Sequence, residues 1–158
     1  MRIQSLSSLQ LLLEKAHRDL EIDLATYLEQ VLSTIAKTKE EGNRIDLVWS
    51  LAEANADSRD ALVIGLIVNE LVENAYRQAF PGNRPGTITV DMKTTGGGVS
   101  IAVSDSGTGS RSEKDGRLSK NAGFGIVSAL AARIGARLSC VSDDGFNVRI
   151  DVPRDRSA

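Results

Sequence analysis

The chain has 158 residues, of which 41% are apolar and 25% are charged, and its formal net charge is -2. These values fit one soluble globular domain, and the length is too short for two domains of ordinary size. The near-neutral charge indicates neither nucleic acid nor an anionic membrane as a partner, no apolar run approaches the ~20 residues of a membrane span, and a single cysteine excludes an internal disulfide. We therefore expect a cytoplasmic protein that makes no contact with a membrane.

Residues 1–42 are predicted to form a helical segment. Apolar residues recur at helical spacing in two stretches, and the second stretch runs from Leu24 to Ile35. Asp23 is a candidate N-cap of the second helix, and Gly42 is a candidate terminator. The first stretch carries no small-residue cleavage site, so no signal peptide is predicted.

A strand and a long helix are predicted next. Apolar residues alternate over residues 45–51, which is typical of a half-buried strand. The long helix is expected to begin near residues 57–58 and to stop before Pro81.

Two polar residues stand out in the long helix. Leu62, Leu66 and Ile67 belong to its apolar stripe, and Glu70 and Asn74 border that stripe one turn apart. A carboxylate and an amide are unfavourable there unless something binds them. These two side chains are therefore candidate site residues.

The second half of the chain has the two-residue period of strands. Strands are predicted over residues 87–93 and 99–105, joined as a hairpin, and a second hairpin turns around residues 144–145. Between the hairpins lie a loop of about twenty residues, a length usually found in functional lids or disordered segments, and a helix ending at Gly135. Cys140 falls in an alternating pattern and is expected in the core. This order predicts an α+β sandwich of two layers, with one mixed sheet and helices on one face.

Three stretches carry residue types suited to binding. In NELVENAYR, Glu70, Asn74 and Arg77 point the same way, although a solvated helix edge would look similar. DSGTG begins with Asp105 at the end of a strand, where a simple turn is the plain alternative. GFG begins with Gly123, and glycines at a helix N-terminus leave free N–H groups and a positive dipole end, a combination suited to phosphate. A GxG pattern by itself is weak evidence.

The order of the three stretches resembles the Bergerat-type ATP-binding fold of sensor histidine kinases, gyrase B, Hsp90 and the MutL proteins. GLIVNELVENAYRQAFPG is most similar to the HWE-like branch of the histidine kinases, whose helix reads roughly L-I-x-N-E-L-x-x-N-A-x-x-H-A-F. The resemblance covers essentially the whole chain. It implies a mixed, mostly antiparallel sheet packed on helices, with an ATP-binding catalytic domain over residues 43–158. Residues 1–42 would then be a remnant of the dimerisation region and its linker.

The resemblance implies roles for three helix residues. Asn74 would coordinate Mg²⁺ through its amide oxygen, and the ion would bridge the triphosphate of ATP. Glu70 would orient a water in the metal shell or act as the base toward the nucleophile. Arg77 would meet a phosphate. The implied reaction transfers the γ-phosphoryl group of ATP to a histidine, for relay to a response-regulator aspartate.

The resemblance also implies a nucleotide-binding role for residues after the predicted strand. Asp105 would accept a hydrogen bond from the adenine amino group, so that its carboxylate selects adenine over guanine. The other implied ATP-binding residues lie beneath the base or around the phosphates, and they are Gly107, Gly109, Lys120, Gly123, Phe124 and Gly125.

Two positions depart from the family pattern. Gln78 stands where the family has an aromatic residue or a histidine, and the single histidine, His17, falls where the family has linker. The phosphoacceptor histidine is therefore predicted outside this chain, in the same full-length protein or in trans. The predicted partners are a phosphoacceptor-histidine domain and the receiver domain of a response regulator, with homodimerisation left open.

Two other functions are compatible with the same fold. One is a serine kinase of the anti-sigma-factor type, which the closeness of NELVENA and AF to the histidine-kinase helix disfavours. The other is a nucleotide-independent phosphotransfer adaptor, namely a degenerate ATPase fold that no longer binds nucleotide. The retention of Asn74, Asp105 and the motif glycines disfavours the adaptor.

Overall fold

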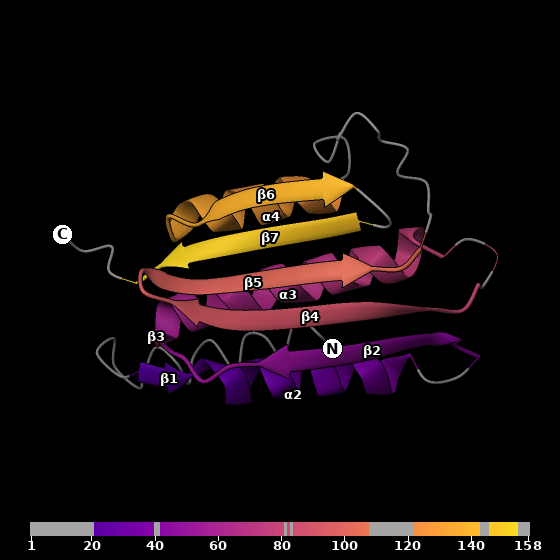
Figure 1. Ribbon diagram of the computed structural model, residues 1–158, viewed down its shortest axis with the longest axis horizontal. Coiled ribbons are helices and arrows are strands. Elements are labelled where there is room, and N and C mark those ends of the chain that lie inside the picture. Colours follow the sequence, from indigo (N-terminus) through magenta and orange to yellow (C-terminus); the bar gives the residue numbers. More distant parts are fainter. Residues whose placement is uncertain are drawn as a thin grey trace.

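The computed structural model describes residues 21–39, 42–80, 82, 84–107, 122–142 and 146–154. Over these residues the protein has two layers, a five-stranded sheet and the helices that cover one of its faces (Figure 1). The strands lie in the order β2 (Ile45–Leu51), β4 (Gly86–Thr95), β5 (Gly98–Asp105), β7 (Phe146–Pro153) and β6 (Arg137–Ser142). The helices are α2 (Leu24–Thr38), α3 (Ser58–Gln78) and α4 (Ala122–Arg133).

The sheet is mixed and mostly antiparallel, as predicted. Strands β2 and β4 run parallel, and every other neighbouring pair is antiparallel. Both predicted hairpins are present, with Thr95 opposite Gly98 in the first and Ser142 opposite Phe146 in the second. The predicted fold class is therefore confirmed.

A second, smaller sheet was not predicted. It pairs β1 (Glu21–Asp23) with β3 (Asn55–Asp57) in antiparallel orientation. Each strand has only three residues and includes acidic side chains, so neither carries the alternating apolar pattern that identifies a strand.

The core lies between the large sheet and its helices. Side chains alternate between the two faces of a strand, so every second residue points toward the helices. The inward-facing positions of the three central strands are buried, and they are Ile88, Val90, Met92, Ile101, Val103, Val148, Ile150 and Val152. The expectation for Cys140 was wrong. The residue is exposed, because β6 is an edge strand of the large sheet over the residues that the structure describes.

Helix α2 packs into this same core. The Asp23 carboxylate caps its first turn by accepting hydrogen bonds from the backbone N–H of Thr26 at 3.2 Å and from its hydroxyl at 2.9 Å. One side of the helix is buried, through Leu24, Leu28, Leu32 and Ile35. The division at residue 42 stays a prediction, and this packing favours a domain boundary before α2.

Helix α3 is the central helix. Asp57 is its N-cap and accepts a hydrogen bond from the backbone N–H of Asp60 at 2.8 Å. Its fully buried positions include Ile64, Val68 and Val72, whereas Leu62 and Leu66 of the predicted stripe are half-buried. The described helices include none long and apolar enough to cross a membrane.

Candidate functional site

Glu70 and Asn74 lie on the side of α3 that faces away from α2. The α2 side is identified by Glu73, whose carboxylate binds Lys39 just after α2. Asn74 lies about 100° further around the helix, and Glu70 lies one turn before it. Ile67, two turns before Asn74, is fully buried, and Figure 1 shows α2 and α4 on opposite sides of α3. The two half-buried side chains therefore border the contact between α3 and α4.

Arg77 lies in the last turn of α3 and is exposed. A cation there is favoured by the negative end of the helix dipole. The residue follows Asn74 by three positions, so the two side chains share one side of the helix at its C-terminal end.

The turn after β5 packs tightly against the end of α3. Asp105 accepts a hydrogen bond through Oδ1 from the backbone N–H of Gly107 at 3.0 Å. A Cβ on Gly107 would lie 2.0 Å from the carbonyl oxygen of Ala79, the C-cap residue of α3. The side of the turn toward β4 is also fixed, because Ser106 and Thr87 exchange two hydrogen bonds of 3.0 Å. The turn therefore holds Asp105 at the C-terminal end of α3.

Part of the predicted site falls outside the described residues, namely Gly109 and Lys120. Gly123 and Phe124 belong to α4, which begins at Ala122, so the glycines lie within its first turn. Gly125 is exposed, and a Cβ there would meet nothing within 4 Å among the described atoms. The first-turn N–H groups of α4 have no partner within the helix, which is the property that suits such a turn to an anion.

The residues fit Mg²⁺ only in combination with a phosphate ligand. Among the described residues no group of three or more His, Cys, Asp or Glu side chains could hold a metal ion. Mg²⁺ commonly takes one or two protein ligands together with substrate phosphates and waters. The Asn74 amide and the Glu70 carboxylate, one turn apart, are a donor pair of this kind.

Sequence reasoning missed a polar cluster on the α2 side of α3. Lys39 Nζ lies 2.7 Å from Glu73 Oε1 and 5.1 Å from the centroid of the Tyr76 ring. The sequence carries little sign of this cluster, since the two charges are separated by more than thirty residues. Burial raises the pKa of Tyr76, and the charges of Glu73 and Asp46 raise it further.

Tyrosine ionisation is expected to destabilise the fold at alkaline pH. Burial also raises the pKa of Tyr27 above its usual value of 10.0. Because the unfolded chain then loses these protons first, the stabilisation is complete below the unfolded pKa and is lost as pH rises through the folded pKa. Urea unfolding at neutral and alkaline pH measures the effect. Tyr27→Phe and Tyr76→Phe should each flatten the dependence, and an unchanged slope in both variants would contradict the assignment.

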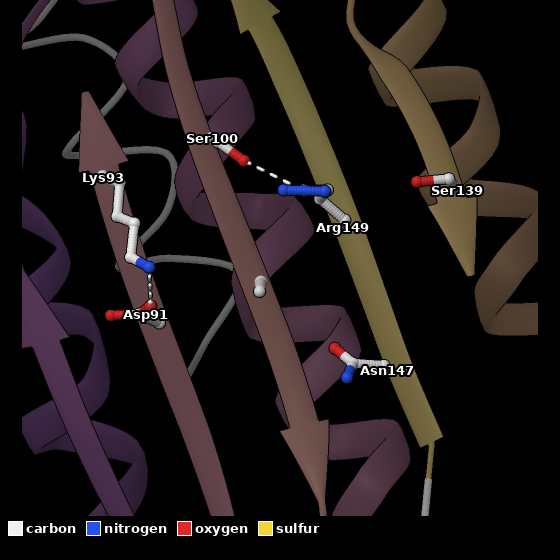
Figure 2. A pocket seen from close by; sticks show the side chains of 7 residues that line it. Asp91, Lys93, Ser100, Ser139, Asn147 and Arg149 are labelled. Atoms are coloured by element: carbon white, nitrogen blue, oxygen red, sulfur yellow. Dashed lines mark hydrogen bonds and ion pairs between the residues drawn. The ribbon is translucent and has the colours of Figure 1, made fainter. Parts of the chain in front are cut away.

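A hollow of about 310 Å³ lies on the open face of the sheet (Figure 2). The charged side chains around it are already paired, because Lys93 lies 3.7 Å from Asp91 and Arg149 lies 3.8 Å from Asp151. Arg149 Nε also donates a hydrogen bond to Ser100 Oγ at 3.2 Å. This hollow contains none of the predicted site residues, which lie on the helical side or at the strand ends.

Comparisons with known proteins agree on one family. The family model described as "Histidine kinase-like ATPase domain" matches residues 31–148. The histidine kinase domain of the Erythrobacter litoralis EL346 blue-light activated histidine kinase is 28% identical, with a TM-score of 0.75, over 84% of this chain and 62% of that chain. The longer structure of that kinase is 27% identical, with a TM-score of 0.76, and the match covers 84% of this chain and 42% of that one.

A more distant match concerns the fold alone. The Acinetobacter baumannii histidine kinase AdeS is 16% identical, with a TM-score of 0.68, over 98% of this chain and 77% of that chain. No curated protein sequence matches the chain. With coverages of 62% and 42%, the chain spans less than two thirds of each of the two EL346 structures.

Proposed function

The chain belongs to the histidine kinase-like ATPase domain family, and from this premise we propose that it is the ATP-binding catalytic domain of a sensor histidine kinase of the HWE-like branch. It would bind Mg-ATP and transfer the γ-phosphoryl group to a histidine outside this chain. The likeness to the EL346 kinase, at 28% identity, supports the proposal. His17 lies outside the described residues and is proposed to be a linker residue.

The observation that carries the proposal is the packing of the Asp105–Gly107 turn on the end of α3. The close approach of Gly107 to Ala79 leaves no room for a Cβ. This packing brings the carboxylate of Asp105, at the end of β5, to the half of α3 that carries Asn74 and Glu70. A base-binding carboxylate and a metal-binding amide must be neighbours if one nucleotide is to reach both.

Each residue has a role that follows from its chemistry. Asp105 is proposed to accept a hydrogen bond from the adenine amino group, and Gly107, whose missing Cβ makes room for Ala79, is proposed to hold that carboxylate beside the base. Asn74 would ligate Mg²⁺, while Glu70 would orient a metal-bound water or accept the proton of the nucleophile. When bound, the ion neutralises phosphate charge.

The phosphates are proposed to lie between the end of α3 and the start of α4. Arg77 would supply a positive charge there, and Lys120 another. Gly109, Gly123, Phe124 and Gly125 complete the proposed nucleotide site. Phosphoryl transfer requires mainly positioning and charge neutralisation, so backbone N–H groups and a few side chains are sufficient.

The proposed partners follow from the reaction. The chain would act on a phosphoacceptor-histidine domain, in the same full-length protein or in trans, and the phosphoryl group would pass to a receiver domain. The chain is proposed to act in the cytoplasm, where ATP is available. It is proposed to contact neither nucleic acid nor a membrane. Incubation of this chain with ATP is expected to label no residue by itself, and acid-labile label on His17 would contradict that expectation.

Calorimetric titration of the chain with Mg-ADP tests the proposal directly. We expect binding with a Kd in the micromolar to millimolar range, corresponding to about 4 to 8 kcal/mol. A wild-type chain that is folded by circular dichroism but binds neither Mg-ADP nor Mg-ATP would contradict the kinase function. That result would favour the nucleotide-independent adaptor instead.

Asn74→Ala is expected to weaken Mg-nucleotide binding about tenfold, which corresponds to the loss of one ligand contact of about 1.4 kcal/mol. Because the proposed contact is with the metal, the affinity for ADP in the presence of a chelator should stay near the wild-type value. Titrations with and without Mg²⁺ measure the difference. Asn69→Ala, a half-buried asparagine on the same helix, is the matched control. An equal loss in both titrations would contradict a metal-ligand role.

A further inference from the structure

Two of the contacts between helices α2 and α3 define how these helices lie. Near the start of α2, Tyr27 packs on Gly65 so closely that a Cβ on the glycine would lie 2.7 Å from the tyrosine ring. Just after the end of α2, Lys39 Nζ binds the Glu73 carboxylate at 2.7 Å. The two helices therefore run in the same direction. The polar contact lies in the half of α3 that also carries the proposed nucleotide site.

The polar contact is built from three side chains. Lys39 approaches the face of the Tyr76 ring, with its ammonium 5.1 Å from the ring centroid, which is within the range of a cation–π interaction. The Glu73 side chain is 17% exposed and that of Lys39 is 30% exposed. Because both groups are partly withdrawn from water, their attraction is screened less than that of a pair on the open surface.

The bond between Lys39 and Glu73 marks which side of α3 faces α2 in the half of the helix whose buried residues are Leu71, Val72 and Ala75. Successive helix residues differ by about 100° around the axis, so a side chain held toward α2 at Glu73 turns its neighbour Asn74 away from α2. Glu70 lies one turn before Asn74 and shares its direction. The Tyr27–Gly65 contact holds the first half of the helix close to α2 but makes no contact with the second half.

We propose that Glu73, held by Lys39, is a positioning residue that sets the rotation of α3 and thereby directs Asn74 and Glu70 toward the nucleotide. The inference rests on the proposed function of Asn74. Glu73 itself does not touch the nucleotide. It also links the chain segment that follows α2 to the helix carrying the metal ligand.

The first test is Glu73→Gln in the full chain, titrated with Mg-ADP and with ADP plus a chelator. The affinity for Mg-ADP is expected to fall about fivefold, a size typical of indirect couplings, while the metal-free affinity stays within about twofold. The melting temperature should change little, because the apolar core is untouched. Glu29→Gln, an exposed carboxylate on α2, is the matched control.

A second test asks whether the effect belongs to the ion pair. Lys39→Met should reproduce the loss, and the double variant Lys39→Met/Glu73→Gln should lose no more than either single variant. Exchange of the two charges, in Lys39→Glu/Glu73→Lys, should restore most of the Mg-ADP affinity. Additive losses or a charge exchange without rescue would overturn the positioning role.

A third measurement does not depend on nucleotide. Amide hydrogen exchange in residues 71–78 of Glu73→Gln should be faster than in the wild type, with the first half of α3 unchanged. Failure of the wild-type protein to bind Mg-ADP would contradict the proposed function. Wild-type binding that Glu73→Gln leaves intact would overturn the positioning role alone. An equal loss with and without Mg²⁺, together with a lower melting temperature, would also overturn it.

Discussion

Replacing Asp105 with asparagine is expected to weaken adenine-nucleotide binding by about 2 to 3 kcal/mol, or roughly 30- to 150-fold in Kd. The asparagine oxygen can still accept the hydrogen bond that Gly107 donates to Asp105 Oδ1 at 3.0 Å. The amide nitrogen would then take the place of the second carboxylate oxygen. A donor would face the adenine amino group, which is itself a donor, so a favourable contact becomes an unfavourable one.

Base selectivity makes the Asp105→Asn experiment specific. Guanine carries an acceptor, O6, where adenine has its amino group, so the variant should lose its preference for adenine when Mg-ADP and Mg-GDP are compared by calorimetry. Asp91→Asn makes the same chemical change on the open face of the sheet and should leave both affinities unchanged. If wild-type protein binds Mg-ADP and Asp105→Asn binds it equally well, Asp105 does not contact the base.

Gly107→Ala is expected to destabilise the fold by about 3 kcal/mol, at the upper end of the usual range for an overpacked site. The added Cβ would lie 2.0 Å from the carbonyl oxygen and 2.6 Å from the carbonyl carbon of Ala79. These are backbone atoms of the C-cap residue of α3, whose N–H is bonded to the carbonyl of Ala75 at 3.0 Å. The turn must therefore move away from α3 and carry Asp105 with it, so nucleotide binding should be lost as well.

Urea unfolding and Mg-ADP titration measure the two effects of Gly107→Ala. Gly96→Ala is the matched control, because a Cβ at Gly96 would meet no described atom within 4 Å. Ala79→Gly should not rescue Gly107→Ala, since the nearest clashing atom is a carbonyl oxygen that glycine also has. Near-wild-type stability of Gly107→Ala would contradict the close packing on which the proposed site depends.

The residues of the proposed site were predicted from the sequence, but their arrangement was not. The spacing of Glu70 and Asn74 places them on one side of a helix wherever that helix packs. Nothing local indicates that the turn after Asp105 meets the end of α3. The same holds for the bond between Lys39 and Glu73, because a contact across thirty-four positions depends on how whole helices lie together.

Local sequence patterns are sufficient to predict the strands of the large sheet and the helices, but not the short strands β1 and β3. Alternating residues specified strands β2, β4 and β5, helical spacing specified α2 and α3, and Asp23 specified the start of α2. These patterns are local, because the side-chain period and the capping hydrogen bonds act within a few residues.

Which faces meet depends on the packing of the whole chain. This packing paired β2 with β4 in parallel and brought the short strands β1 and β3 together. It buried one side of α2 in the common core and left Cys140 exposed on an edge strand. Each outcome depends on which apolar surfaces, distant in the chain, bury one another most completely, and no short stretch of sequence carries that information.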